Sequence, residues 1–234
     1  MLFLRSSCTL LAVTLVAGQL FGGGDDDPTK EALQEIQSYV GSWKGSGSSE
    51  KDKTAIWKET ANWGWRFKGK EVFFAADMPD SKFFKKGELR YIPAKMIFQL
   101  AVTDLKDKKL LFEGKLKKNK LTLERLDEGT KETHQVTINT AGDGDRLIVR
   151  FLVKPENRTL FNLTNGIDYT REGVTFAAAG NKKAECVVTG GLGTMTVSFK
   201  GTTYYVCCSG CRDAFNENPE KIIKEYLAKK KAGQ

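Results

Sequence analysis

The chain has 234 residues, of which 40% are hydrophobic and 28% are charged, an ordinary balance for a globular protein that buries a core. Its formal net charge is +8, but the lysines are interspersed with acidic residues. The densest basic run, Lys115 to Arg125, contains no aromatic residue on which a base could stack. We therefore do not expect a nucleic-acid partner.

The N-terminus has the order of a secretory signal peptide. Arg5 precedes an apolar run from Leu10 to Val16, and Ala17-Gly18 provides small residues for cleavage. We assign residues 1–21 to this segment; the alternative is an uncleaved anchor, because apolar residues reach Phe21. Export to the periplasm, the cell envelope or the medium would expose the remaining cysteines to an oxidising environment, in which disulfides are allowed.

Residues 22–39 read as an acidic linker rich in glycine and aspartate, followed by a short helix. Pro28 suits the first helical position, and Asp27 is the expected N-cap. Leu33 and Ile36 recur at helical spacing, and we expect the helix to end at Gly41.

Apolar and polar residues alternate with period two from Val40 to about Gly173. The expected strands cover 54–60, 63–68, 71–76, 89–92, 96–103, 110–115, 120–126, 134–140, 146–153, 159–163 and 167–171. Turn signals separate most of them, at 68–70, 104–107, 118–119, 142–144 and 165–166. About ten short strands joined by tight turns predict an antiparallel meander. Such a meander removes its edges by closing into a barrel, here over residues 40–176, although a sandwich is the alternative.

Gly41-Ser42-Trp43 stands between the helix and the first strand, and it resembles the G-x-W signature of lipocalins and other calycins. The resemblance implies that Trp43 closes one end of the barrel, that Arg171 on the last strand packs over it, and that the barrel holds a small apolar ligand. Aromatic strand residues more often fill a core than a ligand site. The aromatic residues in question are Trp43, Trp57, Trp63, Trp65, Phe73, Phe74, Phe98 and Phe151.

The sequence offers no catalytic set. His134 is the only histidine, so an H-E-x-x-H motif is excluded, and we find no Ser/His/Asp arrangement. The carboxylates of the strand region are numerous, but none is marked out by its neighbours. We therefore expect a noncatalytic protein.

After a small-residue linker at 177–183, residues 184–234 contain four of the five cysteines: Cys186, Cys207, Cys208 and Cys211. Alternation over 194–200 and 202–206, with a Lys200-Gly201 turn, predicts a hairpin between the first and second of these cysteines. A helix is expected from Ser209, which places Cys211 in its first turn, where the N–H groups favour a thiolate.

A final helix is expected to begin at Asn218-Pro219. Its apolar stripe would consist of Ile222, Ile223, Tyr226 and Leu227. Several thiolates near one helix start select zinc or a soft ion such as copper(I), in preference to magnesium or calcium.

The segment from Gly201 to Phe215 reads G-T-T-Y-Y-V-C-C-S-G-C-R-D-A-F, and N-P-E-K follows at 218–221. Together with Cys186, which is separated from Cys207 by 20 residues, it resembles the YHS/TRASH family of small treble-clef-like metal modules. The resemblance implies binding, trafficking or sensing of heavy metals. Thr189 stands where many members have a further cysteine. We therefore expect a site of three thiolates, from Cys186, Cys207 and Cys211, to which Cys208 is a candidate fourth ligand.

The sequence thus predicts a mainly β protein: an antiparallel lipocalin/calycin-like β-barrel followed by a small α+β treble-clef-like YHS/TRASH module. We expect an exported metal-binding protein that captures or senses a soft heavy metal, copper or zinc. Its metal ligands would be Cys186, Cys207, Cys208 and Cys211, and its partners would include a small apolar ligand and a cell-envelope protein. The alternative is a lipocalin-like carrier or interaction protein whose cysteines form structural disulfides, with Cys186 bonded to one of the other three.

Overall fold

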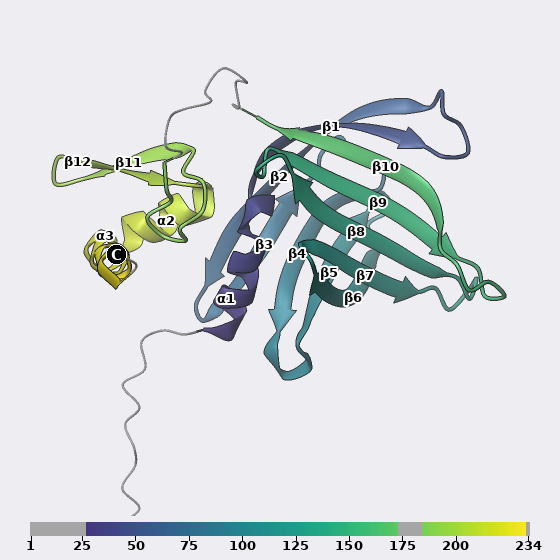
Figure 1. Ribbon diagram of the computed structural model, residues 1–234, viewed down its shortest axis with the longest axis horizontal. Coiled ribbons are helices and arrows are strands. Elements are labelled where there is room, and N and C mark those ends of the chain that lie inside the picture. The colour runs from purple at the N-terminus through teal and green to yellow at the C-terminus, as the bar shows by residue number, and fades with distance from the viewer. Residues whose placement is uncertain (1–26, 173–183, 233–234) are drawn as a thin grey trace, which may run out of the picture.

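The computed structural model describes residues 27–172 and 184–232 (Figure 1). The expected signal peptide at 1–21, most of the acidic linker and the second linker at 177–183 lie outside the described residues. Within the described ranges, no helix is both long enough and apolar enough to cross a membrane.

Ten antiparallel strands form a closed barrel, in which each strand pairs with its neighbour in sequence and the first pairs with the last (Figure 1). The barrel predicted from period-two alternation is therefore confirmed, and the sandwich is excluded. The strands are β1 (Gly41–Ser49), β2 (Ile56–Lys68), β3 (Glu71–Asp77), β4 (Phe84–Ile92), β5 (Ile97–Asp104), β6 (Lys109–Lys117), β7 (Lys120–Leu126), β8 (Thr133–Ala141), β9 (Arg146–Lys154) and β10 (Asn162–Arg171).

Two strands are continuous where the sequence predicted breaks. β2 runs through 61–62, because Ala61 continues the inward series that Glu59 begins and Trp63 extends, while Asn62 faces outward and pairs with Asp77. β10 runs through 165–166, where an irregularity in the pairing after Leu163 replaces the predicted turn. β4 begins at Phe84, five residues before its predicted start.

A short helix and Arg171 close one end of the barrel. Helix α1 (Pro28–Glu35) has the predicted cap, since Asp27 Oδ1 accepts a hydrogen bond from Thr29 N at 2.9 Å. It ends earlier than predicted, and a 3₁₀ turn, η1 (Gln37–Tyr39), leads into β1. The Arg171 guanidinium lies 4.2 Å from the centroid of the Trp43 ring, as expected from the G-x-W pattern.

The barrel interior is densely packed. Six of the eight aromatic residues singled out in the sequence are buried, and Trp57 and Phe151 are partly buried against them. The Glu59 carboxylate is also buried, and it accepts hydrogen bonds from Trp57 Nε1 at 2.6 Å and from the Tyr169 hydroxyl. The adjoining cavity has about 40 Å³, enough for a few water molecules.

The C-terminal residues form a hairpin followed by two helices, as predicted. Strands β11 (Met195–Phe199) and β12 (Thr202–Val206) are joined by Lys200 and Gly201, both at positive φ. Helix α2 (Ser209–Glu217) and helix α3 (Pro219–Ala232) follow. Of the four residues predicted to form the apolar face of α3, Ile222, Ile223 and Tyr226 pack against the core. The prediction is wrong at Leu227, which points away from the core and is 50% exposed.

This C-terminal module packs against α1 and the barrel strand β2 (Figure 1). Gly210 of α2 approaches the β2 backbone so closely that a Cβ there would lie 1.9 Å from the carbonyl oxygen of Trp65. From the other side, Gln34 Nε2 of α1 donates to the carbonyl oxygen of Thr189 at 3.2 Å. The module and the barrel therefore share one continuous buried core.

Candidate metal centre

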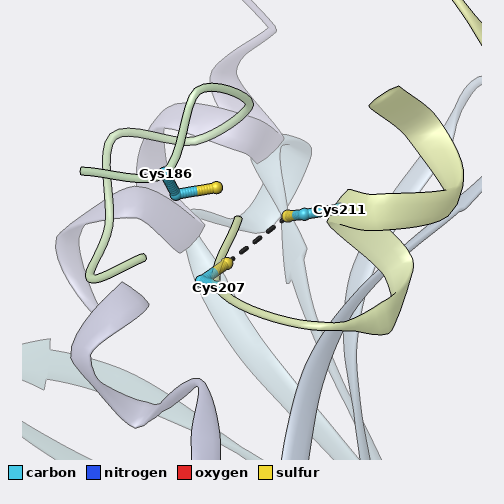
Figure 2. Close-up of side chains that lie close together, drawn as sticks. All are labelled: Cys186, Cys207 and Cys211. Atoms are coloured by element: carbon cyan, nitrogen blue, oxygen red, sulfur yellow. Dashed lines mark hydrogen bonds between the residues drawn. The ribbon is translucent and has the colours of Figure 1, made fainter. Parts of the chain in front are cut away.

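Three cysteines from three separate segments meet at the centre of the module (Figure 2). Cys186 comes from the loop before the hairpin, Cys207 directly follows β12, and Cys211 lies in the first turn of α2. Their Sγ atoms all lie within 4.8 Å of one another, and those of Cys207 and Cys211 are 3.4 Å apart. Three of the four cysteines predicted as ligands thus form one group.

The loop that carries Cys186 is fixed by its backbone. Cys186 N donates to the carbonyl oxygen of Gly191 at 2.7 Å, and Gly190 N donates to that of Cys186 at 2.8 Å. Gly190 has a φ of +77°, a conformation that glycine adopts without a steric penalty. The next residue, Val187, donates from its N–H to the carbonyl oxygen of Tyr205 at 2.8 Å, which holds the loop beside β12.

Thr189 occupies the side of the group where a fourth ligand would stand. It is buried, and its Oγ1 lies 3.7 Å from Cys207 Sγ. Both its hydroxyl and its backbone N–H also contact the Cys186 thiol. The sequence pattern placed Thr189 at a ligand position, and the structure brings it to the sulfurs.

The sulfurs share their protons. Hydrogen bonds from Cys207 and then Cys211 lower the pKa of Cys186, with a smaller contribution from Thr189. In the same hydrogen bonds Cys207 and Cys211 act as donors to Cys186, which raises the pKa of both thiols. Because these groups titrate together, the proton positions belong to the cluster as a whole. A metal ion at the centre would replace these shared protons.

The spacing of the sulfurs fits a thiolate-bound metal. A metal–sulfur bond of about 2.3 Å places neighbouring sulfurs about 3.8 Å apart in a tetrahedral site and about 4.0 Å apart in a trigonal one. The Cys207–Cys211 distance of 3.4 Å is slightly shorter than these values, and the two distances to Cys186 Sγ are at most 4.8 Å. Among the described residues the group consists of sulfur ligands alone, which favours soft ions.

Cys208 lies next to the group and outside it. Its Sγ is 3.9 Å from Cys207 Sγ, but it does not join the set in which all the sulfurs are within 4.8 Å of one another. The side chain is directed toward β2, where a Cβ added at Gly64 would lie 3.6 Å from the sulfur. Hydrogen bonds from Cys207 and Cys211, with a smaller one from the Trp65 backbone, lower the pKa of Cys208.

Arg171 of the barrel lies near the cysteines, which no pattern in the sequence indicates. Burial lowers the pKa of its guanidinium, while electrostatic interactions with Asp145 and then Cys207 act in the opposite direction. Arg171 and Cys207 line the same crevice between the barrel and the module. The two residues come from segments that only the packing of the module on the barrel brings together.

No family model matches the sequence, and no curated protein matches it either. Among solved structures, the crystal structure of Rv2717c from M. tuberculosis is similar to this chain at 15% sequence identity and a TM-score of 0.37. The match covers 60% of this chain and 97% of that one.

Proposed function

We propose that the protein is a noncatalytic metal-binding protein that captures or senses a soft metal ion, copper(I) or zinc, through Cys186, Cys207 and Cys211. The observation that carries this proposal is the meeting of three buried sulfurs within 4.8 Å of one another. Each comes from a different segment, and no disulfide joins them. The metal is the cargo of the protein, since nothing in the group suggests a reaction.

Copper(I) fits the donor set better than zinc does. Structural zinc sites take four ligands, and here the group next to the three sulfurs is the neutral hydroxyl of Thr189, 3.7 Å from Cys207 Sγ. Three thiolates around copper(I) would carry a net charge of −2, which is costly to bury without a cation nearby. The Arg171 guanidinium, whose charge interacts with Cys207, supplies that cation.

The proposal also includes export of the protein and its likeness to the YHS/TRASH family. The signal-peptide-like residues 1–21 favour export, and an exported thiolate site would meet metal ions at the cell envelope. The likeness of residues 201–221 to YHS/TRASH modules points to the same class of cargo. Capture of a soft ion, or a response to it, is the role that these features have in common.

A small-ligand carrier with structural disulfides is the weaker candidate. The cavity beside Glu59, of about 40 Å³, is too small for an apolar ligand. A second hollow of about 350 Å³, lined by Phe84, Phe112 and Phe151, is large enough for a small one, but no cysteine lines it. A disulfide between Cys207 and Cys211 would require their sulfurs, now 3.4 Å apart, to approach to about 2.05 Å. The metal proposal requires a smaller change in the cluster.

The test is to purify the chain lacking residues 1–21 under anaerobic conditions, count its free thiols, and measure bound copper and zinc by mass spectrometry. We expect about one ion per chain, and loss of that ion in Cys211→Ser, because one of only three thiolates is removed. Ser209→Ala, an exposed change in the same helix, is the matched control and should keep the metal. Fully oxidised cysteines, or a reduced protein that takes up neither ion, would contradict the proposal.

A further inference from the structure

A crevice of about 480 Å³ lies between the module and the closed end of the barrel. Arg66 of β2 and Arg171 of β10 line it from the barrel side, and Met195, Cys207 and Cys208 line it from the module side. The crevice therefore reaches the cysteine group from outside, and three of the side chains along it carry sulfur.

The four cysteines are graded in depth along this crevice. Cys208 is 8% exposed and Cys207 is 6% exposed, and both line it. Cys186 and Cys211 are 0% exposed and lie behind them. Cys207 connects the two levels, because its Sγ is 3.9 Å from that of Cys208 and 3.4 Å from that of Cys211. An ion that enters through the crevice meets Cys208 and Cys207 before the inner pair.

Met195 adds a second soft donor at the outer level. It begins β11 opposite Val206, the residue before Cys207, and it is only partly buried. A thioether is a neutral ligand that selects copper(I) over hard ions. Cys208 and Met195 thus offer soft ligands outside the three-sulfur group, where an ion can bind without being enclosed.

Building on the proposed function, we infer that the crevice is the port through which the metal enters, and that Cys208 and Met195 form a transient exchange site ahead of the resident ligands Cys186, Cys207 and Cys211. The cargo that suits this port is a soft monovalent ion that arrives as an anionic thiolate complex. Two guanidinium groups line the crevice against one carboxylate, Glu172, which is paired with Lys44 at 2.9 Å. A positive port disfavours a free cation and attracts an anionic complex.

The transfer is a series of ligand exchanges without a change in oxidation state. The Cys208 sulfur bonds to copper(I) as its thiol proton leaves to solvent, the neutral Met195 thioether bonds without losing a proton, and one donor ligand departs from the metal. Cys207 then bonds as Cys208 did and displaces a second donor ligand, which accepts a proton when it is a thiolate. The bonds to Met195 and Cys208 break once Cys211 and Cys186 have bound and released their protons, and Cys208 is protonated again.

The inference is tested by separating the rate of uptake from the affinity. The reduced chain lacking residues 1–21 is mixed anaerobically with the anionic copper(I)–bicinchoninate complex in a stopped-flow instrument, and loss of the complex is followed over a range of protein concentrations. Equilibrium competition with the same chelator gives the affinity. We expect Cys208→Ser and Met195→Leu each to slow the second-order uptake about tenfold while the affinity changes less than about threefold. Asn216→Ala, an exposed change in α2, and Met78→Leu, whose methionine is buried in the barrel, are the matched controls and should leave both quantities unchanged.

Charge at the port is tested with Arg66→Gln. This variant should slow uptake from the anionic complex, and it should leave uptake from the cationic copper(I)–acetonitrile complex unchanged or faster. Affinity lost in Cys208→Ser to the same extent as in Cys211→Ser would make Cys208 a resident ligand and would overturn the inference, while the proposed function would stand. Unchanged uptake rates in Cys208→Ser and Met195→Leu would overturn it too. A wild-type protein that binds zinc but no copper(I) at equilibrium would overturn the inference alone, whereas one that binds neither ion would refute the proposed function.

Discussion

Thr189 is the side chain that we expect to set the choice of metal at the proposed site. Its hydroxyl lies 3.7 Å from Cys207 Sγ, and it also contacts the Cys186 thiol, so it faces the same centre as the three sulfurs. A neutral hydroxyl adds little to a soft site, whereas a thiolate at the same place would complete a four-sulfur set. The sequence pattern located this position, and the burial of Thr189 explains why it matters.

Replacing Thr189 by cysteine should therefore shift the site toward zinc. We expect Thr189→Cys to bind zinc at least about tenfold more tightly than the wild type, with a smaller change in copper(I) affinity, because only zinc gains its preferred fourth ligand. Competition with chromophoric chelators for each ion measures the two affinities. Thr189→Ser keeps the hydroxyl and should leave zinc binding unchanged; equal gains in zinc affinity in both variants would refute this role for Thr189.

Arg171 has a structural role that the G-x-W pattern indicated and that the structure makes specific. Its Nη1 donates to the carbonyl oxygen of Val40 at 2.7 Å, and its Nη2 donates to those of Ser38 at 2.7 Å and Gly144 at 2.9 Å. Its ring contact with Trp43 adds a cation–π interaction. One side chain thus joins the residues before β1, the β8–β9 turn and the last strand.

Arg171→Gln should lower the free energy of unfolding by about 2–3 kcal/mol, since it removes charge-assisted hydrogen bonds to buried carbonyl groups. Urea denaturation followed by tryptophan fluorescence measures the change. Arg90→Gln is the control, because Arg90 forms ion pairs with Glu71 and Glu88 near the surface and should cost less than about 1 kcal/mol. Similar losses in the two variants would mean that the contacts of Arg171 at the closed end contribute no more than a surface ion pair.

At the scale of elements, α2 is positioned by a backbone contact. Gly210 allows the first turn of α2, which also carries Cys211, to lie directly on the carbonyl oxygen of Trp65 in β2. Alanine favours a helix over glycine by about 1 kcal/mol, so the substitution would stabilise an isolated helix. Here a Cβ would lie 1.9 Å from a backbone oxygen, and the helix or the strand would have to move.

We therefore expect Gly210→Ala to destabilise the protein by about 2 kcal/mol, because the steric cost of overpacking exceeds the gain in helix propensity. Metal affinity should fall as well, because the displacement moves Cys211 relative to Cys186. Thermal unfolding and chelator competition measure the two effects. Asn216→Ala, an exposed change in the same helix, should alter neither quantity. A Gly210→Ala protein at least as stable as the wild type would show that the contact is loose.

The elements themselves could largely be predicted from local signals. The cap at Asp27, the Lys200-Gly201 turn and the start of α3 at Pro219 depend on residues close in sequence. The predictions failed where a small or polar residue continues a strand, as at Ala61 and Gly166, because local composition resembles a turn there while pairing across the barrel decides the outcome.

At the scale of the whole molecule, the packing of the module on the barrel could not be predicted. The cysteine spacing predicted that Cys186, Cys207 and Cys211 would meet, because all three lie within one module. The place of Cys208 beside β2 and the approach of Arg171 depend on contacts between segments far apart in sequence. The alternation of polar and apolar residues indicates which face of β2 is buried. It does not indicate that the C-terminal module is the part of the chain that packs against this strand.

The continuous core has a consequence for how the metal affects stability. The four tryptophans of the chain all lie between residues 43 and 65, in β1 and β2, so the unfolding transition that their fluorescence records is that of the barrel strands. The proposed metal ligands all belong to the module. If the two parts unfold together, an ion bound in the module must raise the unfolding temperature that the barrel tryptophans record.

An ion present at about 100 times its Kd stabilises the folded state by about 2.7 kcal/mol, which for a chain of this length raises the unfolding midpoint by up to about 5–10 °C. We expect this increase in tryptophan fluorescence when copper(I) is added to the reduced protein, and its reversal when a chelator removes the ion. Cys211→Ser, which lacks a ligand, should show neither change. The unfolding midpoint can also be recorded by far-ultraviolet circular dichroism, which reports on the helices. If the ion raises that midpoint but not the midpoint recorded by tryptophan fluorescence, the module unfolds independently of the barrel. The ion would then stabilise its own module without affecting the barrel, despite the contact between Gly210 and Trp65.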